Sequence, residues 1–535
     1  METQNSDVLI VGGGIAGLVT AYECLNDGLS VRILERDVAA NLGGLAKRSF
    51  GGMALVDTPL QRKMGINDSP DIALKDWSSF ANFSEHDLWP KAWAKYYVDH
   101  CSKDVYEWLI QHGLKFLPAV NWVERGQYGE GNCLPRYHVL WGTGFGLVQR
   151  FISLIKTHVN RHKITICYEH KVNGFIKSNG SIKGCKAIDE SLSVPREFYA
   201  KHIVVAAGGM GGNLKKVRDN WYSPWGKAPS EILNGSHKYA DGLMHDVLVD
   251  EGAKVTHLDK MWNYAAGIPH PNPSFEGEGL SLIPCKNALW LDHTGKRIGP
   301  EPLVTGFDTN ELCRRVSQLE QPYTWQLFNW KIAIKEFAVS GAEHNINIRD
   351  KHWFAFLKEV LLGNHRLIKQ MKAQSDHFIV ADKLSTLVVK MNALNNNDFV
   401  NYDAVKAQVE QYDKMIQKGP RLWNDDQLRR IQHARSWRSD KLRTCKPQGI
   451  LTDGSGPLIA VKLRLISRKS LGGIQTDLQS RVLDTRGNPI DGLFAVGEAA
   501  GFGGGGASGF KSLEGTFLSG CILTARAAAK SICEH

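Results

Sequence analysis

The sequence predicts an α/β protein in which both chain ends build one domain and a largely helical α+β capping domain is inserted between them. Three observations support this fold class. A strand, a glycine turn, a helix and a second strand follow one another at the start of the chain. Another strand, a glycine cluster and a helix close it. Between them, residues 325–435 contain only three glycines and show apolar positions at helical spacing.

The first of these segments is well defined. Residues 7–11 (DVLIV) form an apolar, β-branched run that is typical of a buried strand, and residues 18–25 (LVTAYECL) have helical spacing. Residues 30–34 (SVRIL) predict a second buried strand, which ends at Glu35. The turn between the first strand and the helix has the pattern G-x-G-x-x-G. This order of elements is that of a Rossmann-like dinucleotide-binding unit.

Each residue of the pattern has a physical role. Gly12 allows the tight turn, Gly14 lets the backbone approach a pyrophosphate, and Gly17 lets the helix pack closely on the strand. The helix N-terminus offers N–H groups and a positive dipole end to phosphates. Glu35 can accept hydrogen bonds from ribose hydroxyls. The pattern therefore predicts a bound dinucleotide, and by itself it does not distinguish FAD from NAD.

The C-terminal region supplies the distinction. Residues 492–496 (GLFAV) predict a buried strand that ends at Gly497 and Glu498, and a helix begins near Glu514. Glu498 can hold a ribityl or sugar hydroxyl, and the helix N-terminus can stabilise charge at the electron-accepting end of a flavin. Residues 201–207 (KHIVVAA) predict a strand of the same sheet. Two glycine regions far apart in sequence that converge on one long ligand favour FAD over NAD.

We expect an FAD-binding domain from residues 1–250 and 430–535, with a capping and substrate domain over residues 251–429. The length of 535 residues corresponds to roughly three to four domain-sized units. In the middle region, residues 402–416 place Val405, Val409, Tyr412 and Ile416 on one helical face, which predicts a helix packed on a core.

Composition excludes several classes of protein. With 43% hydrophobic and 22% charged residues, the chain is an ordinary globular protein. The net charge of +10 is not gathered in basic runs, so we expect no nucleic-acid partner. No apolar run is long enough to span a bilayer, and the ten cysteines show no metal-type spacing. We expect a cytoplasmic protein without a metal, an integral membrane segment or a secretory signal.

In combination, the motifs resemble the fumarate reductase/succinate dehydrogenase flavoprotein family over almost the whole chain. The nearest branch looks like the 3-ketosteroid-dehydrogenase-like FAD-binding dehydrogenases. The segments that carry the resemblance are VGGGIAG (11–17), Gly43-Gly44, SFGG (49–52), WGTG (141–144), VVAAGG (204–209), SGAE (340–343), Gly472-Gly473, GLFAVGEA (492–499) and LEGTF (513–517).

The resemblance implies hydride transfer between a flavin and a carbon next to a carbonyl or carboxylate of a small molecule. It also implies a wider set of cofactor contacts. Besides Gly12, Gly14, Gly17, Glu35 and Glu498, the expected cofactor-binding residues are Ile15, Ala16, Arg36, Gly43, Gly44, Ser49, Gly51, Gly52, Val172, Ala206, Ala207, Gly208, Gly473, Gly497, Leu513, Glu514, Gly515 and Thr516.

The chain departs from the family at several positions. Members with covalent FAD have a histidine soon after the first glycine motif, whereas the first histidine here is His86, so we expect non-covalent FAD. Where fumarate reductases have Thr-Thr-Arg-Asp, this chain has Thr-Gly-Phe-Asp, and Phe307 cannot donate a proton. Lys469 stands where fumarate reductases have a carboxylate-binding histidine. These changes argue against fumarate reduction.

The candidate catalytic residues are Tyr137, His138, Ser508 and Lys511. Tyr137 and His138 precede the WGTG turn, and either can exchange a proton, tyrosine as a base only if a nearby cation lowers its pKa. Ser508 and Lys511 belong to the segment SGFK, where many relatives in the closer branch have His-Gly-Tyr-Arg. A packing role for Tyr137 and His138 and a surface role for the lysine are the alternatives.

Three functions remain open at this point, besides other oxidase or monooxygenase chemistry. The first is dehydrogenation or ene-reduction of a ketosteroid-like or other apolar carbonyl compound, and some tryptophans would then line an apolar pocket. The second is reduction of a small unsaturated carboxylic acid, which Lys469 and Lys511 would bind. The third is a flavoprotein that binds a partner or senses redox state. A homo-oligomer or a separate electron-acceptor partner is compatible with each.

Overall fold

The computed structural model describes residues 4–127, 129–178 and 180–534 and divides the chain into two compact units. The first consists of Met1–Tyr222, Ser236–Trp262 and Arg468–His535, and the second of Ser223–Gly235 and Asn263–Ser467. The mixed α/β fold class is confirmed. The chain passes from one unit to the other after residues 222, 235, 262 and 467, and the expected domain bounds at 250 and 429 stay a prediction.

The main sheet of the first unit has a parallel core. Its strands run in the order β20 (Arg481–Leu483), β21 (Pro489–Ala495), β9 (Val194–Val205), β1 (Gln4–Val11), β2 (Val31–Leu34) and β6 (Ile164–Cys167). All neighbours from β21 to β6 pair in parallel, and β20 is antiparallel to β21. The hairpin of β7 (His170–Ser178) and β8 (Ser181–Asp189) extends β9 in antiparallel fashion.

The predicted strands of both chain ends therefore belong to one sheet. The segment expected at residues 201–207 forms the end of β9, which lies between β1 and β21. These strands are apolar because both faces are covered, as is usual for parallel sheets. Leu9, Ile203 and Leu493 from the three strands are completely buried in one core cluster.

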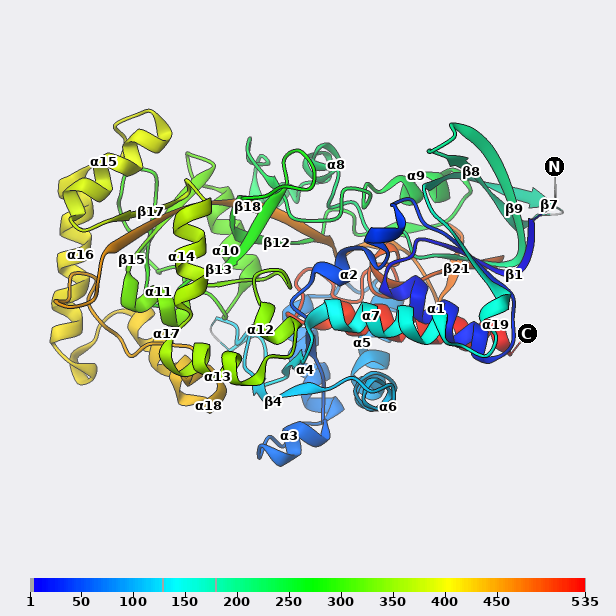
Figure 1. Cartoon of the computed structure of the whole chain (residues 1–535), viewed down its shortest axis with the longest axis horizontal. Helices are drawn as coiled ribbons and strands as arrows, with labels where there is room; N and C mark the ends of the chain where they lie inside the picture. The colour runs from blue at the N-terminus through cyan, green and yellow to red at the C-terminus, as the bar shows by residue number, and fades with distance from the viewer. Residues whose placement is uncertain (1–3, 128, 179, 535) are drawn as a thin grey trace. The chain divides into compact units, whose positions relative to one another are not determined.

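Helices from the two ends also pack together. Helix α1 (Ile15–Asn26) contacts both α7 (Thr143–Lys156) and α19 (Thr516–Cys533), and Figure 1 shows the three side by side. An ion pair of 2.9 Å between Arg526 Nε of α19 and Glu23 Oε1 of α1 joins them at the surface.

Short elements complete the first unit. Two small antiparallel sheets are formed by β3 (Gly52–Ala54), β5 (Tyr137–Leu140) and β4 (Phe116–Asn121), and by β11 (Val255–Thr256) and β19 (Gly473–Ile474). The remaining helices are α2 (Gly44–Arg48), α3 (Pro59–Lys63), α4 (Pro70–Ala81), α5 (Leu88–Cys101), α6 (Trp108–Gln111), α8 (Leu214–Asp219) and α9 (Leu243–Asp250).

The second unit is built on a sheet that the helical spacing did not reveal. Its strands run in the order β14 (Leu289–Leu291), β15 (Tyr323–Asn329), β18 (Leu458–Ser470), β12 (Met261–Pro269), β13 (Gly279–Ile283) and β16 (Ala338–Val339), and β10 (Leu233–Asn234) and β17 (Phe378–Ala381) also pair with β18. The long strand β18 ends near the division at residue 467.

Helices surround this sheet as expected for an α+β unit. They are α10 (Thr309–Ser317), α11 (Trp330–Glu336), α12 (Ile346–Arg349), α13 (Trp353–Leu362), α14 (His365–Gln374), α15 (Leu384–Asn395), α16 (Tyr402–Gln417), α17 (Asp426–Ser436) and α18 (Arg438–Lys441). The prediction for residues 402–416 is confirmed, since Val405, Val409 and Tyr412 of α16 are buried. Among the described residues, no helix is both long and apolar enough to cross a membrane.

A buried ion cluster holds the loop before β5. Arg136 donates two hydrogen bonds of 2.8 Å to the carboxylate of Asp68 and one of 2.5 Å to Asp76 of α4. The side chains of Arg136 and Asp68 are almost inaccessible to solvent. Gln61 Nε2 also donates to Asp68 at 3.0 Å, and the N–H of Cys133 donates to Asp76 at 2.9 Å, but Arg136 supplies the positive charge that pairs with both carboxylates.

Replacing Arg136 with Met should therefore strongly destabilise the first unit. We expect Arg136→Met to lower the free energy of unfolding by about 3–5 kcal/mol, because two buried carboxylates lose the cation that pairs with them. The matched control is Arg62→Met, which removes an exposed pair with Asp57 at 2.7 Å and should cost less than about 1 kcal/mol. Denaturant titration of both variants measures the difference, and equal losses would contradict the prediction.

Candidate functional site

The carboxyl ends of three parallel strands lie level at one edge of the main sheet. Val11 at the end of β1 pairs with Val205 of β9, and Val205 pairs with Ala495 of β21. Ligands of open α/β sheets bind outside the carboxyl ends of the strands. The loops that leave these three ends begin with the predicted cofactor residues Gly12, Ala206, Ala207, Gly208, Gly497 and Glu498.

The turn between β1 and α1 is packed tightly on one side and open on the other. A Cβ on Gly12, whose φ is +104°, would lie 2.5 Å from the carbonyl oxygen of Ala206, and a Cβ on Gly17 would lie 2.1 Å from that of Gly12. A Cβ on Gly14 would meet no atom within 4 Å. Gly14 therefore faces open space at the N-terminus of α1, where Ile15 and Ala16 form the first turn, and a pyrophosphate fits there.

Glu35, at the end of β2, lies against this turn. Its carboxylate accepts hydrogen bonds from the backbone N–H of Gly13 at 2.6 Å and of Asp37 at 2.7 Å. Each carboxylate oxygen retains a lone pair with which it can accept a ribose hydroxyl. Arg36 is held elsewhere, in ion pairs with Glu190 at 3.2 Å and Asp241 at 2.8 Å.

A second glycine pair closes the same turn. The backbone N–H of Gly43 donates to the carbonyl oxygen of Gly13 at 3.0 Å, and α2 begins at Gly44. The predicted residues Ser49 and Gly51 pack against the start of α7. The N–H of Gly144 donates to the carbonyl oxygen of Ser49 at 3.1 Å, and a Cβ on Gly51 would lie 2.8 Å from Thr143. Val172 is a buried residue of the β7 core.

The C-terminal loop reaches the N-terminal turn directly. A Cβ on Gly497, whose φ is +65°, would lie 3.0 Å from the Cβ of Ala16 in α1. The backbone N–H of Gly497 donates to Thr524 Oγ1 of α19 at 2.9 Å. Gly473 is bridged to Ala500 just beyond this loop. The structure thus brings the predicted residues of both chain ends into one place.

Glu498 is tied to the loop after β9. Its Oε1 accepts the backbone N–H of Ser470 at 2.9 Å, and Ser470 Oγ accepts the N–H of Met210 at 2.9 Å. Sequence reasoning missed Ser470, although its place between Lys469 and the Gly472-Gly473 pair was a usable signal. Burial raises the pKa of Glu498 and lowers the pKa of Lys469, which lies close to its charge.

Helix α19 begins at a glycine that packs on β3. Gly515 is the N-cap, with φ +102°, and its carbonyl oxygen accepts the N–H of Ala54 at 2.8 Å. No side chain caps this helix start, which leaves its N–H groups for another acceptor. Leu513 and Thr516 are buried on either side of Gly515. Glu514 accepts the indole N–H of Trp262 at 2.7 Å, a pairing with no signal in the sequence.

Tyr137 lies beside Gly52 and Gly515. A Cβ on Gly52 would be 1.9 Å from the Tyr137 hydroxyl oxygen, and a Cβ on Gly515 would be 3.0 Å from the ring. Burial raises the pKa of Tyr137, and the charge of Glu514 raises it further. The condition that Tyr137 needs to act as a base, a cation that lowers its pKa, is therefore not met. A raised pKa instead keeps the hydroxyl protonated.

His138 points to the other face of β5 and has fixed partners. Its Nδ1 donates to the carbonyl oxygen of Arg136 at 2.8 Å, and its Nε2 accepts from the hydroxyl of Thr58 at 2.8 Å. The side chain is completely buried, which lowers the pKa of His138 to about 4. This environment suits a neutral packing residue rather than the catalytic role considered from the sequence.

The other two catalytic candidates lie in and after the glycine cluster. Ser508 is buried and donates to Ser512 Oγ at 3.2 Å, which in turn bonds Thr516 Oγ1 at 2.8 Å at the start of α19. Lys511 is partly exposed, with its Nζ 5.0 Å from the centre of the Phe80 ring. Ser508 thus belongs to a hydroxyl chain that leads to the helix N-terminus.

A histidine–carboxylate group in the second unit bears on the expectation of no metal. His270, Glu343 and His344 lie close enough to share an ion. The N–H of Asn272 donates to His270 Nδ1 at 3.1 Å, so Nε2 carries the ring proton and donates it to Glu343 at 2.8 Å. Because this pair is satisfied without an ion, the absence of a bound metal stays our prediction.

Gly14 offers a direct test of cofactor binding. In Gly14→Ala, the added methyl group meets no protein atom, so the variant should fold normally but obstruct the predicted pyrophosphate. We expect its affinity for FAD to fall at least about tenfold. Gly146→Ala is the matched control, since that Cβ also meets nothing within 4 Å and lies in α7. Equilibrium dialysis with FAD measures both, and equal affinities would contradict the prediction.

His138 should contribute to acid sensitivity. Its folded pKa of about 4 lies below the ordinary 6.5, so the stability due to the neutral ring is complete above pH 6.5 and is lost as the pH falls toward 4. The drop in unfolding free energy between pH 7 and pH 4 should be smaller in His138→Gln than in the wild type, by up to about 3 kcal/mol. Denaturant titrations at both pH values test this, and an unchanged drop refutes it.

Comparison with known proteins agrees with this geometry. Residues 7–518 match the model of the FAD binding domain family. The KsdD-like steroid dehydrogenase of Mycobacterium tuberculosis is 39% identical over 552 aligned positions, covering 100% of this chain and 96% of the relative. The KsdD-like steroid dehydrogenase of Mycolicibacterium smegmatis is also 39% identical, over 96% of each chain.

Solved structures show the same fold. The 3-ketosteroid Δ1-dehydrogenase of Sterolibacterium denitrificans, at 16% identity, superposes with a TM-score of 0.71 over 99% of this chain and 100% of its own. The family match also establishes FAD as the cofactor. The chain belongs to the FAD binding domain family of flavoprotein oxidoreductases.

Proposed function

We propose that the protein transfers hydride between FAD and a carbon next to the carbonyl of a ketosteroid-like compound. The observation that carries this proposal is the 39% identity with KsdD-like steroid dehydrogenases along the full length of both chains. The reaction is dehydrogenation or ene-reduction of a CH–CH bond, with FAD supplying the hydride acceptor or donor when bound. An apolar carbonyl compound also suits the replacement of the family's arginine acid by Phe307.

Different residues of the first unit bind different parts of FAD. The open backbone at Gly14 and the N-terminus of α1 bind the pyrophosphate, and Glu35 holds a ribose hydroxyl. Glu498 holds a ribityl hydroxyl, and the N-terminus of α19, with Gly515 as cap, stabilises negative charge on the isoalloxazine. The lack of any histidine before His86 supports non-covalent attachment, so acid precipitation of the holoenzyme should release the flavin.

Tyr137 is our proposed proton carrier. Its hydroxyl lies beside Gly52, and its ring beside Gly515. Because burial and Glu514 raise its pKa, Tyr137 stays protonated near neutral pH and can donate a hydrogen bond or a proton to a substrate carbonyl. Ser508, buried and linked through Ser512 to the start of α19, positions that helix rather than reacting.

The two lysines support a neutral substrate. Lys469 is close to both Glu514 and Glu498, and its Nζ lies 4.0 Å above the ring of Phe517. Lys511 lies near the Phe80 ring. Because Glu514 and Glu498 already face the cations Lys469 and Arg468, these charges are balanced, and a substrate carboxylate would add unbalanced negative charge. Reduction of a small unsaturated acid is the weaker alternative.

We also propose that the protein works in the cytoplasm. All ten cysteines are free in the structure, and Cys24, Cys101, Cys185, Cys285 and Cys313 are buried. Free thiols are maintained in reducing compartments.

The proposed reaction can be tested by reducing the enzyme-bound flavin with substrate. Under anaerobic conditions, saturated 3-ketosteroids should bleach the flavin absorbance of the holoenzyme, or unsaturated 3-ketosteroids should reoxidise the dithionite-reduced protein. Fumarate-type acids should do neither. If no ketosteroid changes the flavin spectrum and an unsaturated acid reoxidises it, the alternative is correct. If neither class acts, a redox-sensing or partner-binding role is favoured.

Tyr137→Phe should slow this reaction by about two to four orders of magnitude, the usual effect of losing a general acid or base. Bound FAD should stay the same, and the residual rate should lose its dependence on pH. Tyr106→Phe is the matched control, since Tyr106 stacks on Phe116 at 4.9 Å in the same region and should retain full activity. Stopped-flow absorbance measures both rates, and an equal effect of the two changes rules out the role of Tyr137.

A further inference from the structure

Helix α13 of the second unit is apolar yet has no buried residue. Its sequence, WFAFLKEVLL, is interrupted only by Lys358 and Glu359. A surface helix of a globular unit normally buries its apolar stripe and exposes a polar one. Helix α13 instead exposes apolar side chains, which marks it as an interaction surface.

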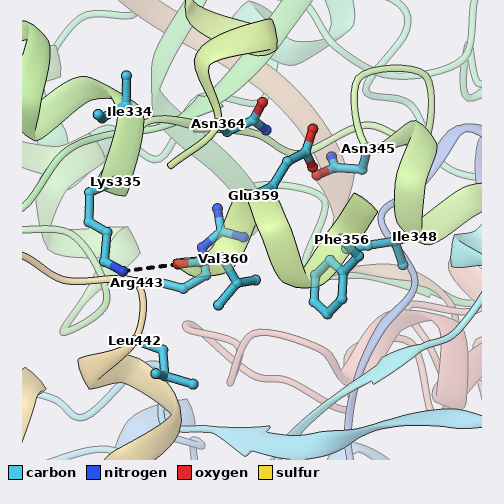
Figure 2. Close-up of a pocket in the computed structure, with 10 residues that line it drawn as sticks. All are labelled: Ile334, Lys335, Asn345, Ile348, Phe356, Glu359, Val360, Asn364, Leu442 and Arg443. Atoms are coloured by element: carbon cyan, nitrogen blue, oxygen red, sulfur yellow. Dashed lines mark hydrogen bonds between the residues drawn. The ribbon is translucent and has the colours of Figure 1, made fainter. Parts of the chain in front are cut away.

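One face of α13 is fastened to the rest of its unit. Figure 2 shows Phe356, Glu359 and Val360 of α13 on a small pocket that Ile334, Lys335, Leu442 and Arg443 also line. Lys335 Nζ donates to the carbonyl oxygen of Val360 at 3.0 Å, and Glu359 pairs with Arg366 at 3.3 Å. These contacts fix which way the helix faces.

The opposite face carries the exposed apolar groups. Phe354 is 87% exposed and Leu361 is 67% exposed, and at 100° per residue they lie on one side together with Lys358 and Leu362. Leu442, on the rim of the same pocket, is also exposed. We call Phe354, Lys358, Leu361 and Leu362 the α13 face.

Exposed lysines accompany the α13 face. Lys358 belongs to the face, Lys351 lies two residues before α13, and Lys441 is the sequence neighbour of Leu442. The nearby acids are partnered: Asp350 pairs with Arg349 at 2.7 Å, and Glu359 pairs with Arg366. A surface that combines phenylalanine and leucine with lysines is complementary to anionic lipid headgroups above an apolar layer.

We propose that the α13 face docks on the surface of an anionic lipid bilayer. Phe354, Leu361 and Leu362 enter the boundary between headgroups and acyl chains, and the lysines contact lipid phosphates. A second copy of the chain fits less well. The helix is only about 15 Å long, whereas a stable interface buries about 800 Å² on each partner. The proposal goes beyond the proposed function and does not depend on the identity of the substrate.

Vesicle binding tests the proposal. FAD-loaded protein should cosediment with vesicles of phosphatidylcholine and phosphatidylglycerol, weakly with phosphatidylcholine alone, and less at high salt. Phe354→Ser combined with Leu361→Ser should lower the partition coefficient at least about tenfold, since two large side chains lose their burial. Lys351→Glu combined with Lys358→Glu should abolish the preference for anionic vesicles.

The matched control is Val389→Ser on α15 of the same unit. Val389 is also 67% exposed, and its replacement should leave vesicle binding unchanged. Equal FAD content and equal thermal midpoints in all variants establish that the variants are folded. If the variant with Phe354→Ser and Leu361→Ser does not fold, the variant with Lys351→Glu and Lys358→Glu provides the test. Wild-type protein that does not bind anionic vesicles overturns the proposal. The proposal is also overturned if the variant with Phe354→Ser and Leu361→Ser binds vesicles like the wild type. It is overturned as well if the only change in this variant is the loss of a dimer in analytical ultracentrifugation.

Discussion

The close approach of backbone to backbone at Gly12 is the constraint on which the site depends. With a side chain at Gly12, the carbonyl oxygen of Ala206 would have to move, and with one at Gly17, α1 could not follow β1 so closely. Because β1, β9 and β21 end at the same level, any shift of this turn would also displace the loops at Ala206 and Gly497. The glycines therefore fix three loops at once.

The same constraint explains how two distant chain ends form one site. Gly497 lies against Ala16, and Arg526 pairs with Glu23, so α1 helps to position both the C-terminal loop and α19. The two acidic residues of the site have different surroundings. Glu35 accepts hydrogen bonds from two backbone N–H groups, whereas Glu498 accepts the N–H of Ser470 and burial raises its pKa.

Much of the first unit was predictable because its signals are local. The strand, glycine turn and helix at residues 7–26 depend on hydrophobic periodicity and on glycines whose backbone conformation few other residues adopt. The division at residue 467 was not predictable from the sequence. Strand β18 has thirteen residues, and nothing in its apolar run indicates the unit to which it belongs. The sheet of the second unit was also not predicted from the sequence, because strands as short as β16 and β17 resemble helix ends in sequence.

Candidate site residues were harder to assign, because their role depends on partners that are distant in sequence. Tyr137 and His138 are adjacent, yet strand alternation sends one to Gly52 and Gly515 and the other to Thr58. The pairing of Glu514 with Trp262 spans 252 positions and has no sequence signal. The sequence gives the number of tryptophans, but only the structure shows that Trp262 holds the carboxylate of Glu514, which raises the pKa of Tyr137.

The charge balance around Lys469 then connects cofactor and substrate. Burial lowers the pKa of Lys469, while the charges of Glu514 and Glu498 oppose that effect, and burial also raises the pKa of Glu498. A fumarate-type acid would add one or two negative charges to a place where two carboxylates already face the cations Lys469 and Arg468. A neutral ketone adds none and needs one hydrogen-bond donor, which the protonated Tyr137 can provide. The electrostatics of this site therefore favour a carbonyl over a carboxylate substrate.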